Sequence, residues 1–589
     1  MTKFFSRFSV FFLICFVLFC THFSFAEQLD LANEEPRWQK VISGAPVAKP
    51  LKTTYGFVIV TDGHQINACS ENGVVLWEQS VKGFPTPYYT VARGDFLYVV
   101  TSENKLNLIN PSGVTLWSEY VPFSEIISSP ASGADGRMFV QGKTQIACYG
   151  LNGKMKWCID IGEMENTPLF TLNDGSILAL LSKTDGGNSV GIRLSPFGEK
   201  IEEITFGGKI TKAVECAQGL FMVFSDGSAG LCKVKENIGK SGWFISATEA
   251  GFGRVSEDTL FLTSSENIVS AIVVRGSNAE ATLFNTLSLT IQSKFDVSAI
   301  PTAAGFLFMD SENLYIAGKN AASYTLDGEI MWQAKMPPEN EWEYVFYTNS
   351  GHLAFTEKNN WVIKAFRVYQ EPRHIVAKPK EQTINYDTFL IEKTDISGYS
   401  VKALSSKEYA KLMKKLQEGD YPDLEKKWIP IIKNEAKDMA AYYISSDEMK
   451  HDNTSIFKSD IVYQRQLCNL IAAFGSSIFN SELISLLHNV TDKQMLTYLL
   501  QTVSVLGYDE DGSILKEIEF VATKRAMPDD YSLLTSCADA TYSICRVMGR
   551  PALYSRGKKI LAYMLYPQYP KKIREYARKK LEDIIKLGI

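Results

Sequence analysis

The sequence predicts an eight-bladed β-propeller followed by an α-helical domain. In the first part of the chain, a short phrase with a Gly and a Trp recurs every forty residues and ends at Trp77, Trp117 and Trp157; it returns at Trp332. Residues before each phrase alternate between apolar and polar, as in a strand with one buried face. Beyond about residue 400 the apolar residues follow i, i+3 and i+4 spacing, which indicates helices. A period of about 40 in strand-rich units is typical of propellers and other repeat arrays.

Each repeat predicts a tight hairpin turn followed by a buried tryptophan. The turns contain glycines, which tolerate positive φ: Gly73, Gly113, Gly153, Gly198 and Gly328. If the turns have two residues, the first three tryptophans face small or medium side chains on the preceding strand, namely Ala68, Leu108 and Cys148. A large ring at this place fills the space between two neighbouring sheets, so we assign the tryptophans a structural role.

Successive repeats define the blades from residue 35 to residue 369. The first seven units span residues 43–80, 82–120, 124–162, 165–205, 208–245, 246–292 and 296–335, of which the fifth and sixth are poorly marked. An eighth unit begins near Trp342 and lacks a final strand of its own. Trp38 lies in phase with the later tryptophans, so a strand at Trp38 is expected to complete the last blade and close the ring. Seven blades is the alternative count.

Residues 1–26 have the pattern of an export signal. Basic residues precede an apolar run, and small residues offer a cleavage site after Ala26. Lipidation at Cys20 is the alternative, but Phe19 occupies a position where lipoprotein signals carry a small residue. We expect cleavage after Ala26, a periplasmic or envelope location, and no transmembrane helix in the mature chain.

The residue types give little support to catalysis, metal binding or nucleic-acid binding. The formal net charge of −5 argues against a nucleic-acid partner. Cysteines and histidines are dispersed and show no zinc-type spacing. Phosphate-loop, dinucleotide, calcium-loop and serine-hydrolase motifs fail on spacing or on context. We therefore expect no enzymatic activity, no cofactor, and no catalytic or metal-binding residue.

The phrase Gly-x-x-x-Trp at the end of each unit resembles the pyrroloquinoline-quinone-type (PQQ-like) propeller repeat. That repeat occurs in quinoprotein dehydrogenases and in the BamB-like propellers of bacterial outer-membrane protein assembly. The dehydrogenases are expected to carry a vicinal disulfide and a catalytic Asp beside calcium. No two cysteines are adjacent here, and no Asp can be assigned to that role. The resemblance therefore implies the non-enzymatic, BamB-like branch.

A helical domain follows the propeller. Residues 370–400 break the repeat and are expected to form a linker, and residues 401–589 carry helical periodicity. Three predicted helices end in a glycine, which is a common helix C-cap: Gly475, Gly507 and Gly549. Short helices in antiparallel pairs that end in this way resemble HEAT-type repeats from about residue 458. A plain helical bundle is the alternative.

The stretch from Arg556 to Lys586 carries ten Lys and Arg residues against three acidic residues. Its densest part is a candidate partner-binding patch: Lys571, Lys572, Arg574, Arg578, Lys579 and Lys580. Such a patch suits an acidic protein or a weak contact with an anionic membrane surface. The alternative, which we favour, is the solvated outer face of the last helices.

Together these features predict an exported, non-catalytic scaffold that binds other envelope proteins. The resemblance to BamB-like propellers makes outer-membrane protein assembly the leading process. Two other functions stay open. One is a quinone- or metal-dependent oxidoreductase, and the other is a propeller that binds a small ligand or a glycan in its central channel.

Overall fold

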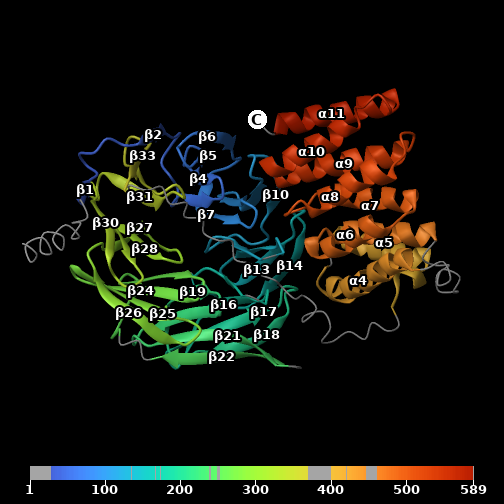
Figure 1. Ribbon diagram of the computed structural model, residues 1–589. Helices are drawn as coiled ribbons and strands as arrows, with labels where there is room; N and C mark the ends of the chain where they lie inside the picture. Colours follow the sequence, from blue (N-terminus) through green and yellow to red (C-terminus); the bar gives the residue numbers. More distant parts are fainter. Residues whose placement is uncertain are drawn as a thin grey trace, which may run out of the picture.

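The computed structural model describes residues 28–133, 135–165, 167–172, 174–237, 240–248, 252–368, 399–419, 421–445 and 460–587. The predicted export signal, with Cys20, and nearly all of the predicted linker lie outside these residues. A ring of β-sheets lies beside a stack of helices (Figure 1). The predicted order, a propeller followed by a helical domain, is confirmed.

Each of the first four blades is a four-stranded antiparallel sheet in chain order. Blades one and two contain β3 (Leu51–Thr53), β4 (Gly56–Val60), β5 (Gln65–Ser70) and β6 (Val75–Ser80), then β7 (Pro85–Ala92), β8 (Phe96–Thr101), β9 (Lys105–Ile109) and β10 (Thr115–Tyr120). Blades three and four contain β11 (Ala131–Ser132), β12 (Met138–Gln141), β13 (Gln145–Tyr149) and β14 (Met155–Asp160), then β15 (Phe170–Thr171), β16 (Ile177–Asp185), β17 (Asn188–Leu194) and β18 (Lys200–Thr205).

The poorly marked fifth and sixth units also form complete blades. They contain β19 (Ile210–Cys216), β20 (Gly219–Phe224), β21 (Ala229–Asn237) and β22 (Lys240–Thr248), then β23 (Leu260–Ser265), β24 (Ile268–Arg275), β25 (Asn278–Asn285) and β26 (Thr290–Val297). Blade seven contains β27 (Pro301–Met309), β28 (Asn313–Gly318), β29 (Asn320–Thr325) and β30 (Ile330–Lys335). First strands of several neighbouring blades contact one another, so these strands lie nearest the axis.

Blade eight is completed from the other end of the chain. It contains β31 (Trp342–Tyr347), β32 (His352–Glu357) and β33 (Val362–Arg367), and β2 (Trp38–Val41) pairs with β33 so that Trp38 faces Ala365. Ring closure by the Trp38 strand and the count of eight blades are therefore confirmed, and the alternative count of seven is wrong. A further strand, β1 (Gln28–Asp30), adds a fifth, parallel strand to blade seven, which the sequence did not predict.

The hairpin turns differ from the predicted two-residue form, yet the predicted pairing holds. In blade one the amide of Ser70 donates to Val74 O at 2.8 Å, which leaves three residues in the turn. This longer turn alone would shift the partner of Ala68 by one residue. A β-bulge in β6 shifts it back, so that Trp77 still faces Ala68. Blades two and three also have irregular register here, and Trp117 faces Leu108 while Trp157 faces Cys148.

The helical domain consists of α3 (Ser406–Glu418), α4 (Pro422–Ile444), α5 (Ile461–Phe474), α6 (Asn480–Asn489), α7 (Lys493–Leu506), α8 (Ser513–Phe520), α9 (Tyr531–Met548), α10 (Pro551–Tyr563) and α11 (Lys571–Leu587). Short 3-10 turns η1 (Val401–Ala403) and η3 (Ser477–Phe479) precede α3 and α6, and the π-helical turn η4 (Val521–Arg525) follows α8. The three predicted C-cap glycines do end α5, α7 and α9, each with positive φ: Gly475, Gly507 and Gly549.

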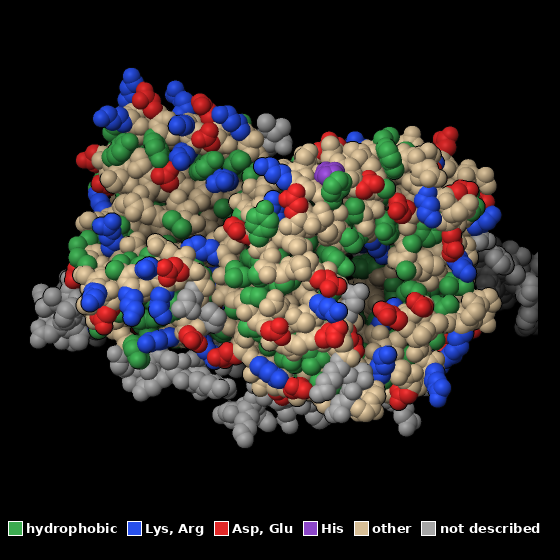
Figure 2. Space-filling view, turned by 180° about the vertical axis from the view of Figure 1, so that it is seen from behind, with side chains coloured by type: hydrophobic (Ala, Val, Ile, Leu, Met, Phe, Trp, Pro, Cys, Tyr) green, Lys and Arg blue, Asp and Glu red, His purple; other side chains and the backbone are tan. Residues whose placement is uncertain are grey.

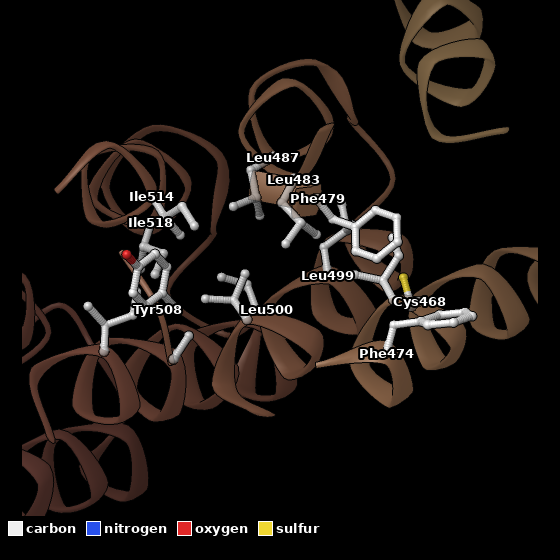
Figure 3. Close-up of a cluster of buried hydrophobic side chains, with 14 of the residues drawn as sticks. Cys468, Phe474, Phe479, Leu483, Leu487, Leu499, Leu500, Tyr508, Ile514 and Ile518 are labelled. Carbon is white, nitrogen blue, oxygen red and sulfur yellow. The ribbon is translucent and has the colours of Figure 1, made fainter. Parts of the chain in front are cut away.

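The helices form two layers. In one layer α3, α5, α7, α9 and α11 follow one another, and in the other α4, α6, α8 and α10 do so. Leucine, isoleucine and aromatic side chains fill the space between the layers (Figure 3), among them Phe479, Leu483, Leu499, Leu500 and Ile518. Within the described part of the chain, no helix is both long and apolar enough to cross a membrane.

Candidate functional site

The repeat tryptophans join neighbouring blades. A Cβ atom on Gly113 of blade two would lie 2.7 Å from Trp77 Cδ2 of blade one, so only glycine fits against this indole ring. The Trp77 indole N–H also donates to Pro111 O in the same turn of blade two, at 2.7 Å. Each such tryptophan therefore packs on the turn glycine of the next blade and hydrogen-bonds to the same turn.

The contact repeats around part of the ring. Gly153 lies against Trp117, and Gly198 against Trp157, so closely that a Cβ atom on either glycine would lie 2.8 Å from the indole. The indole N–H groups of Trp117 and Trp157 donate to carbonyls of the next turn at 2.8 and 3.0 Å. The predicted wedge role of these residues thus has a direct structural basis in the contacts between neighbouring blades.

Three members of the predicted set differ in detail. Trp38 lies against Gly73, as expected for the last blade meeting the first, and stacks on Phe57. Gly328 lies against Phe295, which takes the place of the tryptophan in blade six. Trp332 stacks on Tyr347 of blade eight at a ring-centroid distance of 6.2 Å. Other aromatic side chains therefore complete the contact between blades at these places: Phe295 replaces a tryptophan, and Tyr347 packs against one.

The same turns that receive tryptophans also receive the ends of helices. Gly475, the C-cap of α5, lies so close to Asn152 of blade three that a Cβ atom would meet its Nδ2 at 2.1 Å. Gly549, the C-cap of α9, lies against Asn110 of blade two in the same way, at 2.8 Å. The glycine that ends each of these helices thus allows the helix to approach a propeller turn.

Side chains of the propeller satisfy backbone carbonyls at these helix ends, which have no partner within a helix. Asn110 donates from Nδ2 to Arg546 O at 2.6 Å, and the hydroxyl of Ser112 donates to Gly549 O at 2.8 Å. The Lys156 ammonium donates to Phe474 O, the last residue of α5, at 2.6 Å. A cation is favourable there, since the C-terminal end of a helix carries partial negative charge.

Lys156 belongs to a buried group of charges between the two domains. Glu425, in the first turn of α4, is completely buried, and its two carboxylate oxygens lie 3.0 Å from Arg137 Nη1 and 3.2 Å from Lys156 Nζ. Arg137 also binds Asp135 through Nε at 2.7 Å. Two cations and two carboxylates therefore balance one another in the junction, as burial of charge requires.

Aromatic rings and carbonyls surround these charges. The Lys156 ammonium lies 4.0 Å from the centroid of the Tyr421 ring, and the Arg137 guanidinium lies 4.9 Å from that of Phe197. Arg137 Nη1 donates to Pro196 O, which also accepts the indole N–H of Trp157. Burial lowers the pKa of Lys156, and Glu425 opposes that effect. The junction is thus tied directly to the contact between blades three and four.

Further contacts extend the junction on both sides. Arg93 of blade two pairs with Glu510, and Lys426 of α4 pairs with Glu199 of blade four. One buried apolar cluster includes Tyr98 and Tyr149 of the propeller together with the core of the helical domain. The helical stack is therefore packed onto blades two to four as a continuous interior.

The predicted basic patch lies on α11, and its residues differ in how far they are exposed to solvent. Lys571, Lys572, Arg578 and Lys579 are exposed, whereas Arg574 is half-buried. Lys580 is engaged inside the domain, where it pairs with Asp539 of α9 at 2.8 Å. Lys and Arg side chains gather over this end of the stack (Figure 2).

The hub of the propeller holds two lysines from blade one. Lys49 donates to Gly305 O at 2.6 Å. The ammonium of Lys52, on β3, is buried, has no hydrogen-bond partner among the described residues and lies 4.2 Å from the centroid of Phe308 on β27. The carboxylates of Glu71 and Asp310 partly offset its charge. Burial lowers the pKa of both lysines to about 8. The sequence pattern did not identify either lysine.

The described residues contain no group of three or more His, Cys, Asp or Glu side chains placed to hold a metal ion. Cys148 and Cys158 are separate thiols, as their pairing with Trp157 and Ala147 implies. Burial raises the pKa of Cys468 and Cys545 to about 12, so both thiols stay protonated at neutral pH. These two cysteines therefore behave as buried apolar side chains.

Sequence reasoning missed the junction, although one signal was present. In the other complete phrases, the residue before the tryptophan is apolar: Leu76, Leu116 and Met331. In blade three the same place holds Lys156. A charge at an otherwise apolar position of a repeat indicates a local partner, and here the partner is Glu425.

No protein-family model and no curated protein matches this chain. Solved structures similar to it include BamB from Moraxella catarrhalis, with 11% identity, coverage of 57% of this chain and 100% of that chain, and a TM-score of 0.39. The computationally designed protein Ika8 has 11% identity, coverage of 56% and 98%, and a TM-score of 0.38. Virginiamycin B lyase from Staphylococcus aureus has 13% identity, coverage of 48% and 94%, and a TM-score of 0.33. At 11–13% identity these similarities concern the fold alone.

Proposed function

We propose that this protein is an exported, non-catalytic scaffold that holds other proteins of the bacterial cell envelope in a fixed arrangement. The observation that carries this proposal is the buried junction between the propeller and the helical stack. Glu425, Arg137 and Lys156 are all nearly inaccessible to solvent, and helix ends are capped by propeller side chains. Two large surfaces held rigidly together suit a protein whose task is to orient partners.

The finer assignments belong to the same proposal. The Gly-x-x-x-Trp phrase and the indole–glycine contacts support a PQQ-like repeat of the BamB-like, non-enzymatic branch. The two-layer stack of α3 to α11 supports a HEAT-like domain, since each layer grows by adding one helix of every pair. Outer-membrane protein assembly is the process we propose, and the exposed cations of α11 are one candidate partner surface.

Recovery of partners from the envelope tests this function. A tagged chain, cross-linked in cells and purified from envelope extract, should carry the same small set of proteins in repeated experiments.

Mass spectrometry of the mature N-terminus should find Glu27 first, and a diacylated Cys20 would show lipidation instead. Dye reduction after reconstitution with quinone and calcium would contradict a non-catalytic role and favour an oxidoreductase.

A second candidate function is the binding of a small anionic ligand in the channel. It is favoured by the buried ammonium of Lys52, which lies beside Lys49 and has no hydrogen-bond partner in the described part of the chain, although Glu71 and Asp310 offset some of its charge. A buried cation without a hydrogen bond is costly, and an anion at this place would remove that cost. Thermal-shift screening of small carboxylates and phosphates would detect such a ligand, and Lys52→Met should abolish the shift.

A further inference from the structure

A groove opens between α3 and the first half of α4, at the end of the helical stack opposite α11. Its volume is about 400 Å³. It is lined by side chains of η1, α3, α4 and the residues just before them: Tyr399, Ser400, Ala403, Leu404, Glu408, Lys411, Leu412, Lys415, Lys427 and Trp428. Its size suits one or two inserted side chains and not a folded domain.

The groove has an apolar floor and a cationic rim. Leu412 and Trp428, each 6% exposed, form part of the floor, which only an inserted side chain can reach. Lys411 is exposed on the rim. The ammonium of Lys427 lies 3.6 Å from the centroid of the Tyr399 ring, so a cation and an aromatic face stand side by side at the entrance.

One acidic residue, Glu408, is among those that line the groove, and its carboxylate is held at the start of α3. The carboxylate of Glu408 accepts hydrogen bonds from the backbone N–H of Ser405 at 2.9 Å and from its hydroxyl at 2.6 Å. These bonds form the capping box at the start of α3. Three lysines, Lys411, Lys415 and Lys427, line the groove against this one carboxylate, so the lining keeps an excess of positive charge. A ligand with carboxylates complements that charge.

We propose that this groove binds an acidic peptide segment of a partner protein. An aromatic or branched aliphatic side chain of that segment lies against Leu412 and Trp428, and flanking carboxylates pair with Lys411 and Lys427. A membrane surface fits poorly, because the apolar floor is recessed behind the charged rim. The proposal rests on the scaffold function and names the chemistry of one partner.

Selection from a random peptide library displayed on phage tests the groove with the full mature chain. The peptides recovered should share an aromatic or aliphatic residue flanked by Asp or Glu. Synthetic copies should bind the double variant Lys411→Glu, Lys427→Glu at least about tenfold more weakly, since reversal of both charges puts like charges in contact. Copies with Asn and Gln in place of Asp and Glu should lose a similar amount.

A matched control separates the groove from charge in general. The double variant Lys414→Glu, Lys437→Glu reverses one exposed lysine on each of the same two helices, outside the groove. It should bind the selected peptides with nearly unchanged affinity. Peptides without an acidic and apolar pattern, no selected peptides at all, or equal loss in both double variants would overturn the proposal.

The scaffold function and the groove proposal are tested by different outcomes. Envelope pull-downs with the wild-type chain test the scaffold itself. If the wild type recovers partners and the groove variant recovers all of them equally well, the groove proposal is wrong and the scaffold stands. If the wild type recovers no partner, the scaffold function fails, whatever the peptides show.

Discussion

The buried charges of the junction give the sharpest test of the structure. Glu425→Gln keeps the shape of the side chain and removes its charge, which leaves the Arg137 guanidinium and the Lys156 ammonium near a neutral amide. Breaking one buried ion pair by removing a partner costs about 3–5 kcal/mol. Asp135 still offsets Arg137, so the main unpaired charge is Lys156. We expect the docked arrangement of the helical stack to weaken by about 3–5 kcal/mol, which is a factor of roughly 10²–10⁴ in its equilibrium constant.

Native-state amide hydrogen exchange measures this change where it occurs. A chain with two domains does not unfold as one unit, so a single denaturation curve would mix the two transitions. Exchange of amides in α4 and at the end of α5 should accelerate in the variant, whereas amides in blades six and seven should stay protected. The loss should shrink when Lys156→Met is added, because the stranded cation is then gone.

Glu418→Gln is the control, because Glu418 is 60% exposed and pairs with Lys414, which is itself exposed, at 3.6 Å. Its effect should stay under about 0.5 kcal/mol. If the loss of local stability that exchange reports for α4 in Glu425→Gln is as small as in this control, the buried charges do not hold the junction together, and the reasoning is refuted.

Three further predictions concern the propeller. Trp157→Ala should lower the local stability of blades three and four by about 3–5 kcal/mol, measured by native-state amide hydrogen exchange, because it removes a buried ring. Gly113→Ala should cost at least about 1 kcal/mol more than Gly187→Ala, because both have positive φ but only Gly113 faces an indole ring. Lys52→Met should raise stability by about 1 kcal/mol or more below pH 8. That gain should fade between about pH 8 and 10.5, since the folded-state pKa is lowered to about 8 and the unfolded chain keeps its proton up to about 10.5.

Each of these predictions has an outcome that contradicts it. A loss below about 1 kcal/mol for Trp157→Ala would mean that the blades do not depend on the indole wedge. Equal costs for the two glycine variants would show that the turn yields to a methyl group. A stability difference between Lys52→Met and wild type that does not change across the alkaline range would mean that Lys52 is not held in a desolvated place.

Much of the propeller could be predicted because its information is local and repeated. A turn glycine and the tryptophan four residues later specify one hairpin, and the period of the phrase places Trp38 in the last blade. The predicted turn type was wrong. The extra turn residue moves the partner of Trp77 by one position, and the bulge after the turn moves it back, so the predicted pairing holds. A sequence pattern cannot separate two compensating changes of register from none.

The junction could not be predicted, since it depends on pairs that lie far apart in the sequence. Glu425 looks like an ordinary acidic residue in the first turn of a helix, and its burial follows only from the position of blade three. Asn110 and Asn152 look like ordinary turn residues for the same reason. Lys156 alone departed from the pattern of its repeat, and its partner could not be named without the fold.

The pairing of Trp38 with Ala365 has a consequence for biosynthesis. The strand that completes blade eight is among the first parts of the chain to be made, yet its neighbour β33 is translated after all the other strands of the ring. Contacts of such sequence separation form slowly, because loop-closure entropy must be overcome first. Until then both strands expose unpaired edges, which are prone to aggregate. A cell that makes this protein therefore has to shield a half-built ring, so its yield should depend strongly on chaperones.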